Sequence, residues 1–203
     1  MTAQSTRDAR AALRIVVAED EAIIRLDLVE TLAEEGYDVV GDVGRGDDAV
    51  AMVRSLDPDL VILDIKMPGL DGLSAARALS AERRCAVVVL TAFGQRELIG
   101  DAVDAGVSAY LVKPFQKSEL VAAIEVAVAR HREREELAGE VESLEARLEA
   151  RTLIDRAKAR LMTNGATEAE AFRLLQHRAM NERSTMRAIA EAVLAGELPV
   201  EED

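Results

Sequence analysis

The stretch DLVILDIKMPGLDG, residues 59–72, decides the fold of this chain. It opens with the apolar run Leu60–Leu63, which is typical of a strand buried on both faces of a parallel sheet. Asp64 follows at once, and Met67-Pro68 comes shortly after it. Because open parallel sheets bind ligands beyond the carboxyl ends of their strands, Asp64 is a candidate functional residue.

Further apolar runs share this character, and helical patterns separate them. The runs are Leu13–Ala18, Tyr37–Gly41, Val87–Leu90 and Ala109–Val112. Between the first two, Ala22–Glu35 predicts a helix with an apolar stripe formed by Ile23, Ile24, Leu28 and Leu32. This alternation predicts an α/β domain with a doubly wound, five-stranded parallel sheet over residues 13–131, after a tail at residues 1–12.

Polar side chains stand just past the ends of the predicted strands. They are Glu19, Asp20, Asp64, Thr91 and Lys113. Adjacent carboxylates repel unless a cation compensates them, and Mg²⁺ prefers a few carboxylates together with water and phosphate oxygens. We therefore predict a Mg²⁺ site with Asp20 and Asp64 as direct ligands. Glu19 would bind the ion through water, and the backbone carbonyl of Lys66 would be the remaining ligand from the protein.

Asp64 is also predicted to be the nucleophile that accepts a phosphoryl group. The metal and Lys113 would neutralise the transferred charge, and the Thr91 hydroxyl would donate to a phosphoryl oxygen. The alternative is that Asp20 and Asp64 only cap the helices that follow their strands. The other groups at neighbouring strand ends favour the phosphoryl-transfer interpretation.

A long helical pattern begins near Ser118 and meets no stop signal until about Thr152. Leu137, Val141, Leu144 and Leu148 are spaced 4, 3 and 4 residues apart, which forms a two-heptad apolar seam. We treat residues 132–150 as a helical coiled-coil linker. The seam could pair with another chain or with helices of the same chain.

Residues 151–196 predict a small all-α domain of three helices, followed by a tail at 197–203. The first helix, Arg151–Met162, would end at Asn164-Gly165, since glycine or asparagine commonly terminates a helix. Thr167–Glu170 has the sequence of a capping box and predicts the start of the second helix. Ser184 or Thr185 would cap the third.

The charge is distributed unevenly along the chain. The net charge is −13, yet residues 151–194 contain eight basic and five acidic side chains, an excess of 8 − 5 = +3. The predicted nucleic-acid surface consists of Arg151, Arg156, Lys158, Arg160, Arg178, Arg183 and Arg187. Arg156 and Arg160 would share a helix face, as would Arg183 and Arg187 if their helix begins early enough. The alternative is that these cations pair with nearby glutamates on solvated faces.

Other features of the composition narrow the class of protein. Aromatic residues make up 2% of the chain, so a surface built on base stacking is not expected. A single cysteine, Cys85, excludes an internal disulfide. No signal peptide or run of membrane-spanning length is present, which predicts a cytoplasmic protein without a membrane partner.

The N-terminal motifs carry a family resemblance. AEDE at 18–21, DLVILDIKMPGLDG at 59–72, LTAF at 90–93 and AYLVKPF at 109–115 resemble the receiver domain of two-component response regulators. The resemblance implies a sensor histidine kinase as phosphodonor and Asp64 as phosphoacceptor. It also implies Thr91 and Tyr110 as a switch pair, and Lys113 before a cis Pro114. Many receivers have aspartate where this chain has Glu19.

The stretch 153–194 resembles the ANTAR family of three-helix RNA-binding antitermination modules. The motifs that carry it are Ala157-Lys158, Leu161-Met162, the TEAEAF opening at 167–172 and Ala179-Met180. The chain departs from the family at Ala159 and Arg160. Receiver and ANTAR together imply a phosphorylation-dependent antiterminator that binds tandem RNA stem-loops. Phosphorylation could release a tail that the acidic receiver inhibits, or it could promote a homodimer through the seam at 137–148.

Two other classes of function compete with this hypothesis. A DNA-binding transcription factor would require a recognition helix with base-reading residues, and none is evident. A signalling adaptor would bind protein through its helical tail, which the basic excess disfavours. An enzyme is not expected, because the only chemistry visible is phosphorylation of Asp64 and its reversal.

Overall fold

The computed structural model describes residues 13–92, 100–101 and 104–196. The predicted tails at 1–12 and 197–203, and Phe93 of the LTAF motif, lie outside the described residues. The chain divides into two compact units, Met1–Glu136 and Leu137–Asp203. No helix of the described ranges combines the length and the apolar character needed to cross a membrane.

The first unit contains one sheet with parallel pairing throughout. Its strands are β1 (Arg14–Ala18), β2 (Asp38–Val43), β3 (Leu60–Asp64), β4 (Ala86–Ala92) and β5 (Ala109–Lys113). Their spatial order is β2-β1-β3-β4-β5. The predicted doubly wound five-stranded sheet is thus confirmed. In this order the winding reverses between β1 and β3, which creates a crevice at the carboxyl ends of those strands.

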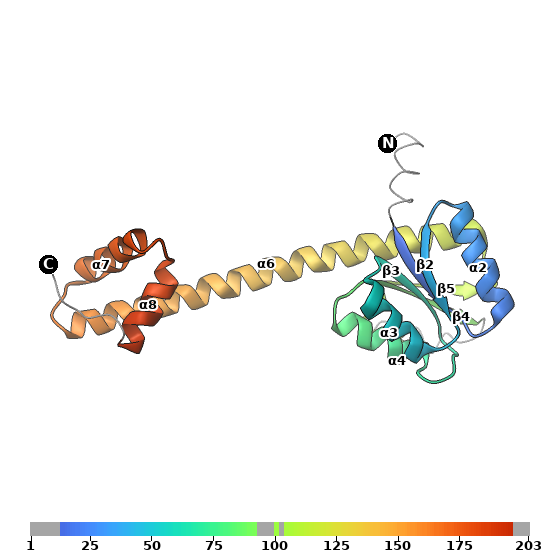
Figure 1. Ribbon diagram of the computed structural model, residues 1–203, viewed down its shortest axis with the longest axis horizontal. Helices are drawn as coiled ribbons and strands as arrows, with labels where there is room; N and C mark the ends of the chain where they lie inside the picture. The colour runs from blue at the N-terminus through green and yellow to red at the C-terminus, as the bar shows by residue number, and fades with distance from the viewer. Residues whose placement is uncertain (1–12, 93–99, 102–103, 197–203) are drawn as a thin grey trace. The chain divides into compact units, whose positions relative to one another are not determined.

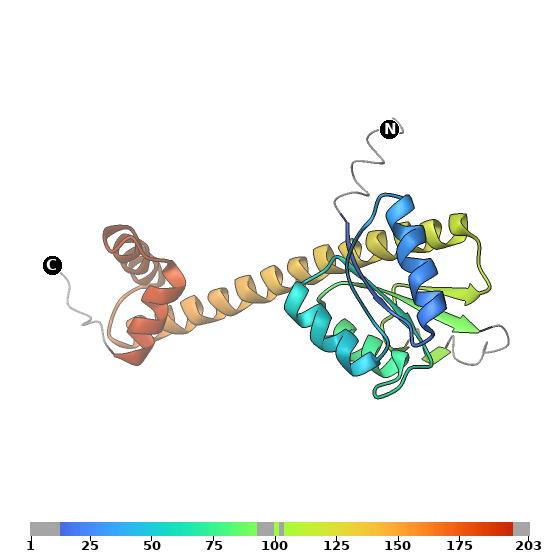
Figure 2. The ribbon, with the colours of Figure 1, turned by 45° about the vertical axis from the view of Figure 1, so that its right-hand side comes forward.

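Helices cover both faces of the sheet. These helices include α2 (Ala22–Glu34), α3 (Gly46–Leu56), α4 (Gly72–Ala81) and the start of α6 (Lys117–Thr163). One apolar core packs the sheet against α3 and α4, and the other packs it against α2 and α6 (Figure 1; Figure 2). The central strand β3 is buried along its whole length, which explains why its sequence is continuously apolar up to Asp64.

The apolar stripe predicted for α2 needs one correction. Leu28 and Leu32 are buried, but Ile23 is 85% exposed. Successive helical residues are rotated by about 100°, so Ile23 cannot share the face of its neighbour Ile24. Cys85 is buried and packs in the core beside α4.

The predicted break near Thr152 is wrong. A single helix, α6, runs from Lys117 to Thr163 and includes the segment that we predicted as a separate helix. Thr152 is tolerated because its hydroxyl donates to the carbonyl of Leu148 at 2.9 Å, within the helix itself. The helix ends where Gly165 adopts a positive φ of 106°, as the sequence predicts.

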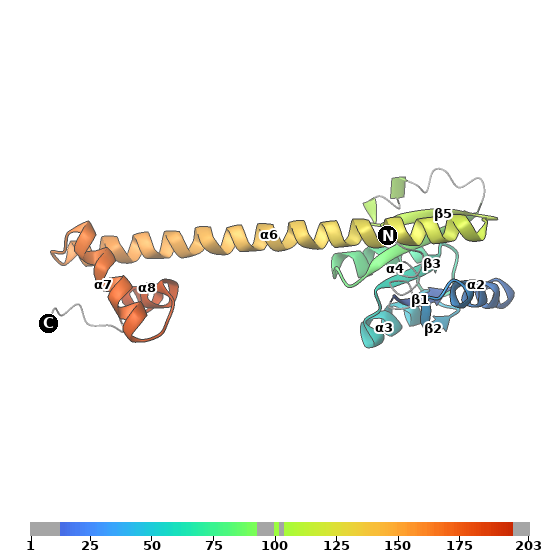
Figure 3. The same ribbon diagram turned by 90° about the horizontal axis from the view of Figure 1, so that it is seen from above.

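The second unit packs the end of α6 with α7 (Glu168–Asn181) and α8 (Met186–Ala195) (Figure 3). Its core consists of Ala157, Leu161, Ala171, Leu175, Ala179, Ile189, Ala190 and Val193. The capping box is present at the start of α7: Thr167 accepts from the backbone of Glu170, whose side chain reaches back to Thr167. Thr185, not Ser184, caps α8.

Candidate functional site

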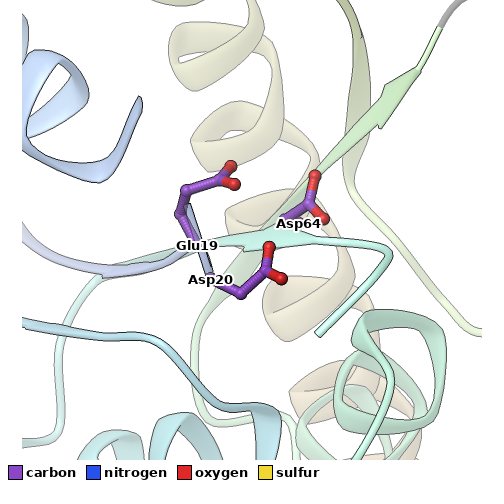
Figure 4. Close-up of side chains that lie close together, drawn as sticks. All are labelled: Glu19, Asp20 and Asp64. Atoms are coloured by element: carbon purple, nitrogen blue, oxygen red, sulfur yellow. The ribbon is translucent and has the colours of Figure 1, made fainter. Parts of the chain in front are cut away.

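Three carboxylates from two neighbouring strands meet in the crevice between β1 and β3. Glu19 and Asp20 follow β1, and Asp64 is the last residue of β3. One carboxylate oxygen from each lies within 4.8 Å of those of the other two (Figure 4). Glu19 and Asp64 are buried, whereas Asp20 is exposed. This set of hard oxygen donors, open to solvent on one side, suits a Mg²⁺ ion that keeps part of its water shell.

Lys113, at the end of β5, supplies the positive charge within this group. Its Nζ donates to Glu19 Oε2 at 2.5 Å and to Asp64 Oδ1 at 2.6 Å. Burial works against the ammonium, but the hydrogen bonds to Asp64 and Glu19 prevail and raise the pKa of Lys113. Burial raises the pKa of Glu19, and the Lys113 hydrogen bond offsets this only in part. Lys113 therefore stays charged and stabilises both carboxylates.

The turn after β3 holds the Asp64 carboxylate in position. The backbone N–H of Lys66 donates to Asp64 Oδ2 at 2.8 Å, while Oδ1 accepts from Lys113 Nζ. Gly72 closes this turn against the strand, and a Cβ on it would lie 2.0 Å from the Asp64 carbonyl oxygen. The carboxylate is thus oriented by one backbone donor and one side-chain donor, as a positioned nucleophile requires.

Two hydrogen bonds hold the backbone of Glu19, one from its N–H and one to its carbonyl. Its N–H donates to the carbonyl of Val43 at 3.0 Å, and its own carbonyl accepts from Arg25 at 2.5 Å. Arg25 also pairs with Asp42 at 2.9 Å. Sequence reasoning missed Arg25, because a single arginine on a helix gives no local signal of a contact with a strand end.

The helix-capping alternative for Asp20 and Asp64 is wrong. The N-cap residues of α2 and α4 are Glu21 and Asp71, and Asp71 accepts from the backbone of Ser74. Asp20 and Asp64 each lie before those caps, so neither carboxylate is needed to satisfy a helix terminus.

The predicted switch residues lie on the two strands beside the site. Thr91 is buried on β4, and its hydroxyl donates to the carbonyl of Ala92 at 3.4 Å. Tyr110 on β5 is 46% exposed, so its ring is turned outward. The peptide bond between Lys113 and Pro114 is cis, as the receiver resemblance implies.

The predicted basic surface is less open than its sequence suggests. Lys158 pairs with Asp155 at 2.8 Å and with Glu168 at 3.0 Å. Arg187 pairs with Glu191 at 3.0 Å and lies 3.5 Å from Glu149. The alternative of cations paired with nearby acids is therefore correct for these two side chains.

The remaining basic residues differ in their surroundings. Arg156 and Arg160 lie one turn apart on α6, as predicted, and Arg160 donates to the carbonyl of Leu194 at 2.8 Å. Arg151 is exposed on α6, and Arg178 lies in the last turn of α7. Arg183 adopts a left-handed conformation in the turn before α8, which begins only at Met186, so the condition under which Arg183 and Arg187 would share a helix face is not met.

Comparison with known proteins matches both halves of the chain. The family described as the response regulator receiver domain matches residues 15–125, and the ANTAR domain matches residues 142–194. The transcriptional regulatory protein PdtaR of Mycobacterium tuberculosis is 53% identical over 192 residues, covering 93% of this chain and 94% of that protein. The chain belongs to the response regulators that join a receiver to an ANTAR domain.

Relatives of the receiver alone extend the comparison. The chemotaxis protein CheY of Thermotoga maritima is 33% identical over 112 residues, which are 55% of this response regulator and 93% of CheY. The solved structure of the receiver domain of a response regulator NarL from Mycobacterium tuberculosis superposes with a TM-score of 0.55 and 28% identity. That match covers 58% of this response regulator and 96% of the NarL domain. The crevice between β1 and β3 therefore belongs to a receiver.

Proposed function

We propose that Asp64 accepts a phosphoryl group from a sensor histidine kinase and thereby controls RNA binding by the ANTAR unit. The observation that carries this proposal is the bridge from Lys113 to both Asp64 and Glu19, built from the ends of three strands. An ammonium that contacts the acceptor carboxylate can stabilise the charge that arrives with the phosphoryl group. We propose no catalysis beyond gain and loss of this group.

In this proposal Mg²⁺ is held by Asp20, Asp64, the backbone carbonyl of Lys66 and, through water, Glu19. The bound ion supplies electrostatic compensation for the incoming phosphate. The protein's own groups do the positioning: the Lys66 N–H orients Asp64, and Lys113 contacts its other oxygen. Thr91 donates its hydroxyl to a phosphoryl oxygen, and Tyr110 turns inward when Thr91 moves.

The proposed RNA ligand is a pair of stem-loops in a nascent transcript, whose capture prevents a terminator hairpin. Among the proposed contacts, Arg156 is the strongest candidate, because it is exposed and has no ion pair within the described part of the chain. Lys158 would have to exchange Asp155 and Glu168 for a phosphate. Arg151, Arg160, Arg178, Arg183 and Arg187 complete the proposed surface. We also propose that the protein acts in the cytoplasm, where a kinase donor and a nascent RNA would both be met.

We further propose that phosphorylation promotes a homodimer through the α6 seam. Leu137, Val141, Leu144 and Leu148 are between 53% and 67% exposed, and each chain therefore presents an uncovered apolar stripe. A second copy of the same helix would bury it by coiled-coil packing. Light scattering of the wild-type protein with and without acetyl phosphate tests this, and an unchanged mass would contradict it.

RNA binding itself is tested by electrophoretic mobility. The full-length protein is titrated into a tandem stem-loop RNA, with and without acetyl phosphate and Mg²⁺. A duplex DNA of equal length serves as the control. Tighter RNA binding after phosphorylation supports the proposal. Preference for the duplex DNA would favour a DNA-binding regulator, and no nucleic-acid binding would favour a protein-binding adaptor.

A further inference from the structure

A hollow of about 700 Å³ opens at the junction of α6 and α7 in the second unit. Its volume falls in the range of about 300–1,000 Å³ that is usual for small-ligand sites. Leu161 and Ala171 line it and are almost fully buried, and Leu174 packs against the same core. These three side chains give the hollow an apolar floor that a flat ring could cover.

The rim of the hollow is polar. Asn164, Glu170, Arg173 and His177 line it beside the apolar floor. Gly165 leaves the mouth open, since a Cβ at this position would meet no atom within 4 Å. An apolar floor with several hydrogen-bonding groups at one edge matches the way proteins hold an unpaired base, with one face in van der Waals contact and one edge read by polar groups.

Glu170 is the group on this rim whose orientation is fixed. Its Oε2 accepts from the Thr167 N–H at 2.8 Å and from the Thr167 hydroxyl at 2.6 Å. These hydrogen bonds lower the pKa of Glu170, so the carboxylate is ionised at neutral pH and can only accept. Within the described residues Oε1 has no hydrogen-bond donor, and it is available to a ligand.

The other rim residues offer donors. The Asn181 amide nitrogen lies 3.1 Å from His177 Nδ1, and because an amide nitrogen can only donate, the neutral ring carries its proton on Nε2. Arg173 uses Nε for the Ala169 carbonyl at 3.3 Å, which leaves its terminal nitrogens for an acceptor or a phosphate. The site thus combines one fixed acceptor with several donors.

We propose that this hollow holds an unpaired guanine from the loop of the bound RNA, read by Glu170. This inference rests on the proposed RNA-binding function and assigns a base-reading site to it. Guanine presents two adjacent N–H donors, N1–H and the N2 amino group, on its Watson–Crick edge, and it carries acceptors at O6 and N7. The free Oε1 of Glu170 can accept from these donors, whereas adenine would direct its N1 lone pair at the anion.

The sharpest variant is Glu170→Gln. Glutamine also completes a capping box, so α7 keeps its N-terminal hydrogen bonds. The substitution removes a negative charge, and electrostatics alone would strengthen RNA binding. A weaker affinity for a guanine loop would therefore report the loss of a specific acceptor. The matched control is Glu168→Gln, which removes the same charge two residues away and frees Lys158 from an ion pair.

The probe is a set of RNAs that share one tandem stem and have randomised loops. Full-length protein treated with acetyl phosphate and Mg²⁺ selects from this set, and the retained loops are sequenced. We expect guanine to be enriched at one loop position by the wild type and by Glu168→Gln, and not by Glu170→Gln. In direct titration, replacing that guanine with inosine, which lacks the N2 amino group, should weaken wild-type binding about tenfold and leave Glu170→Gln unchanged.

Two results would overturn the guanine site. If RNA binds but no guanine is enriched, or if Glu170→Gln selects the same loops as the wild type, the hollow does not read this base while RNA binding stands. If no RNA of the set is retained by the wild type in either phosphorylation state, the proposed RNA-binding function fails together with the site.

Discussion

The receiver and the ANTAR unit hold their charged groups in different ways. In the receiver, Lys113 joins Glu19 and Asp64 across the ends of three strands, and its side chain is 19% exposed. In the ANTAR unit, Arg187 pairs with a glutamate one turn away on an open helix face. Buried groups keep the geometry that the backbone gives them, whereas exposed ion pairs exchange partners at little cost. The chemistry of this protein is therefore preformed in one unit and adaptable in the other.

The strongest test of this division is to remove the core of one unit alone. Leu175 is fully buried between the ANTAR helices. Leu175→Ala should cost about 2–5 kcal/mol of that unit's stability and abolish RNA binding, since its core is small. Phosphorylation of Asp64 should be unchanged.

The thiol of Cys85 reports on the receiver in the same experiment. Burial raises the pKa of Cys85 to about 12, so the thiol should stay unreactive toward a disulfide reagent while the receiver is folded. If Leu175→Ala exposes this thiol as fast as denaturant does, the two units are not independent in the way we propose.

The next largest effect is expected at the preformed site. Lys113→Ala removes the ammonium that compensates Glu19 and Asp64, so the gain in RNA affinity on phosphorylation should fall by about tenfold or more. Because a divalent cation can replace part of the missing charge, Mg²⁺ should raise the melting temperature of the variant more than that of the wild type. Normal activation of the phosphorylated variant would remove Lys113 from the coupling.

A smaller effect is expected on the adaptable surface. Arg156→Ala should weaken RNA binding about threefold to tenfold and reduce the slope of log affinity against log salt by about 1, because one phosphate contact is lost. Lys158→Ala should do less, since Lys158 must first leave Asp155 and Glu168. Titrations of both variants with RNA at two salt concentrations measure the affinity and the salt slope. If neither substitution changes affinity or salt slope, this face of α6 does not contact RNA.

The smallest effect concerns pH. Burial lowers the pKa of His131 below its usual 6.5, against the opposing pull of Glu135. At a pH between the lowered pKa of the folded protein and 6.5, His131 binds more protons in the unfolded chain than in the folded one. The stability of the receiver should therefore rise with pH up to about 6.5 and fall as the pH drops below it. His131→Gln should flatten this dependence in urea titrations at pH 5.5 and 7. If stability depends on pH in the variant as it does in the wild type, titratable groups other than His131 cause the dependence.

The sequence could predict features that depend on a short stretch of the chain, but not contacts between distant elements. The strands, their parallel direction and the convergence of Glu19, Asp20, Asp64 and Lys113 followed from apolar runs that each end at one edge of a sheet. The capping box at Thr167 could also be predicted, because its signal lies within four consecutive residues. Contacts between distant elements had no such signal: the bond from Arg25 to the Glu19 carbonyl is an example.

The errors have physical causes of the same kind. A helix end was predicted near Thr152, but inside α6 the Thr152 hydroxyl donates to the Leu148 carbonyl and the helix continues. Arg183 and Arg187 would share a helix face only if their helix began early enough, and α8 begins at Met186, after Arg183. The hollow beside Gly165 depends on how two helices pack, and no sequence pattern marks it.

The central claim, that phosphorylation of Asp64 controls RNA binding, is tested most directly by one paired measurement. Wild type, Asp64→Asn and the control Asp27→Asn, an exposed aspartate on α2, are treated with acetyl phosphate and Mg²⁺. Intact mass and affinity for the tandem stem-loop RNA are then measured on the same samples. The wild type and Asp27→Asn should each gain one phosphoryl group and bind RNA more tightly, and Asp64→Asn should do neither. Equal phosphate incorporation by Asp64→Asn, or an equal gain in its RNA affinity, would contradict the account.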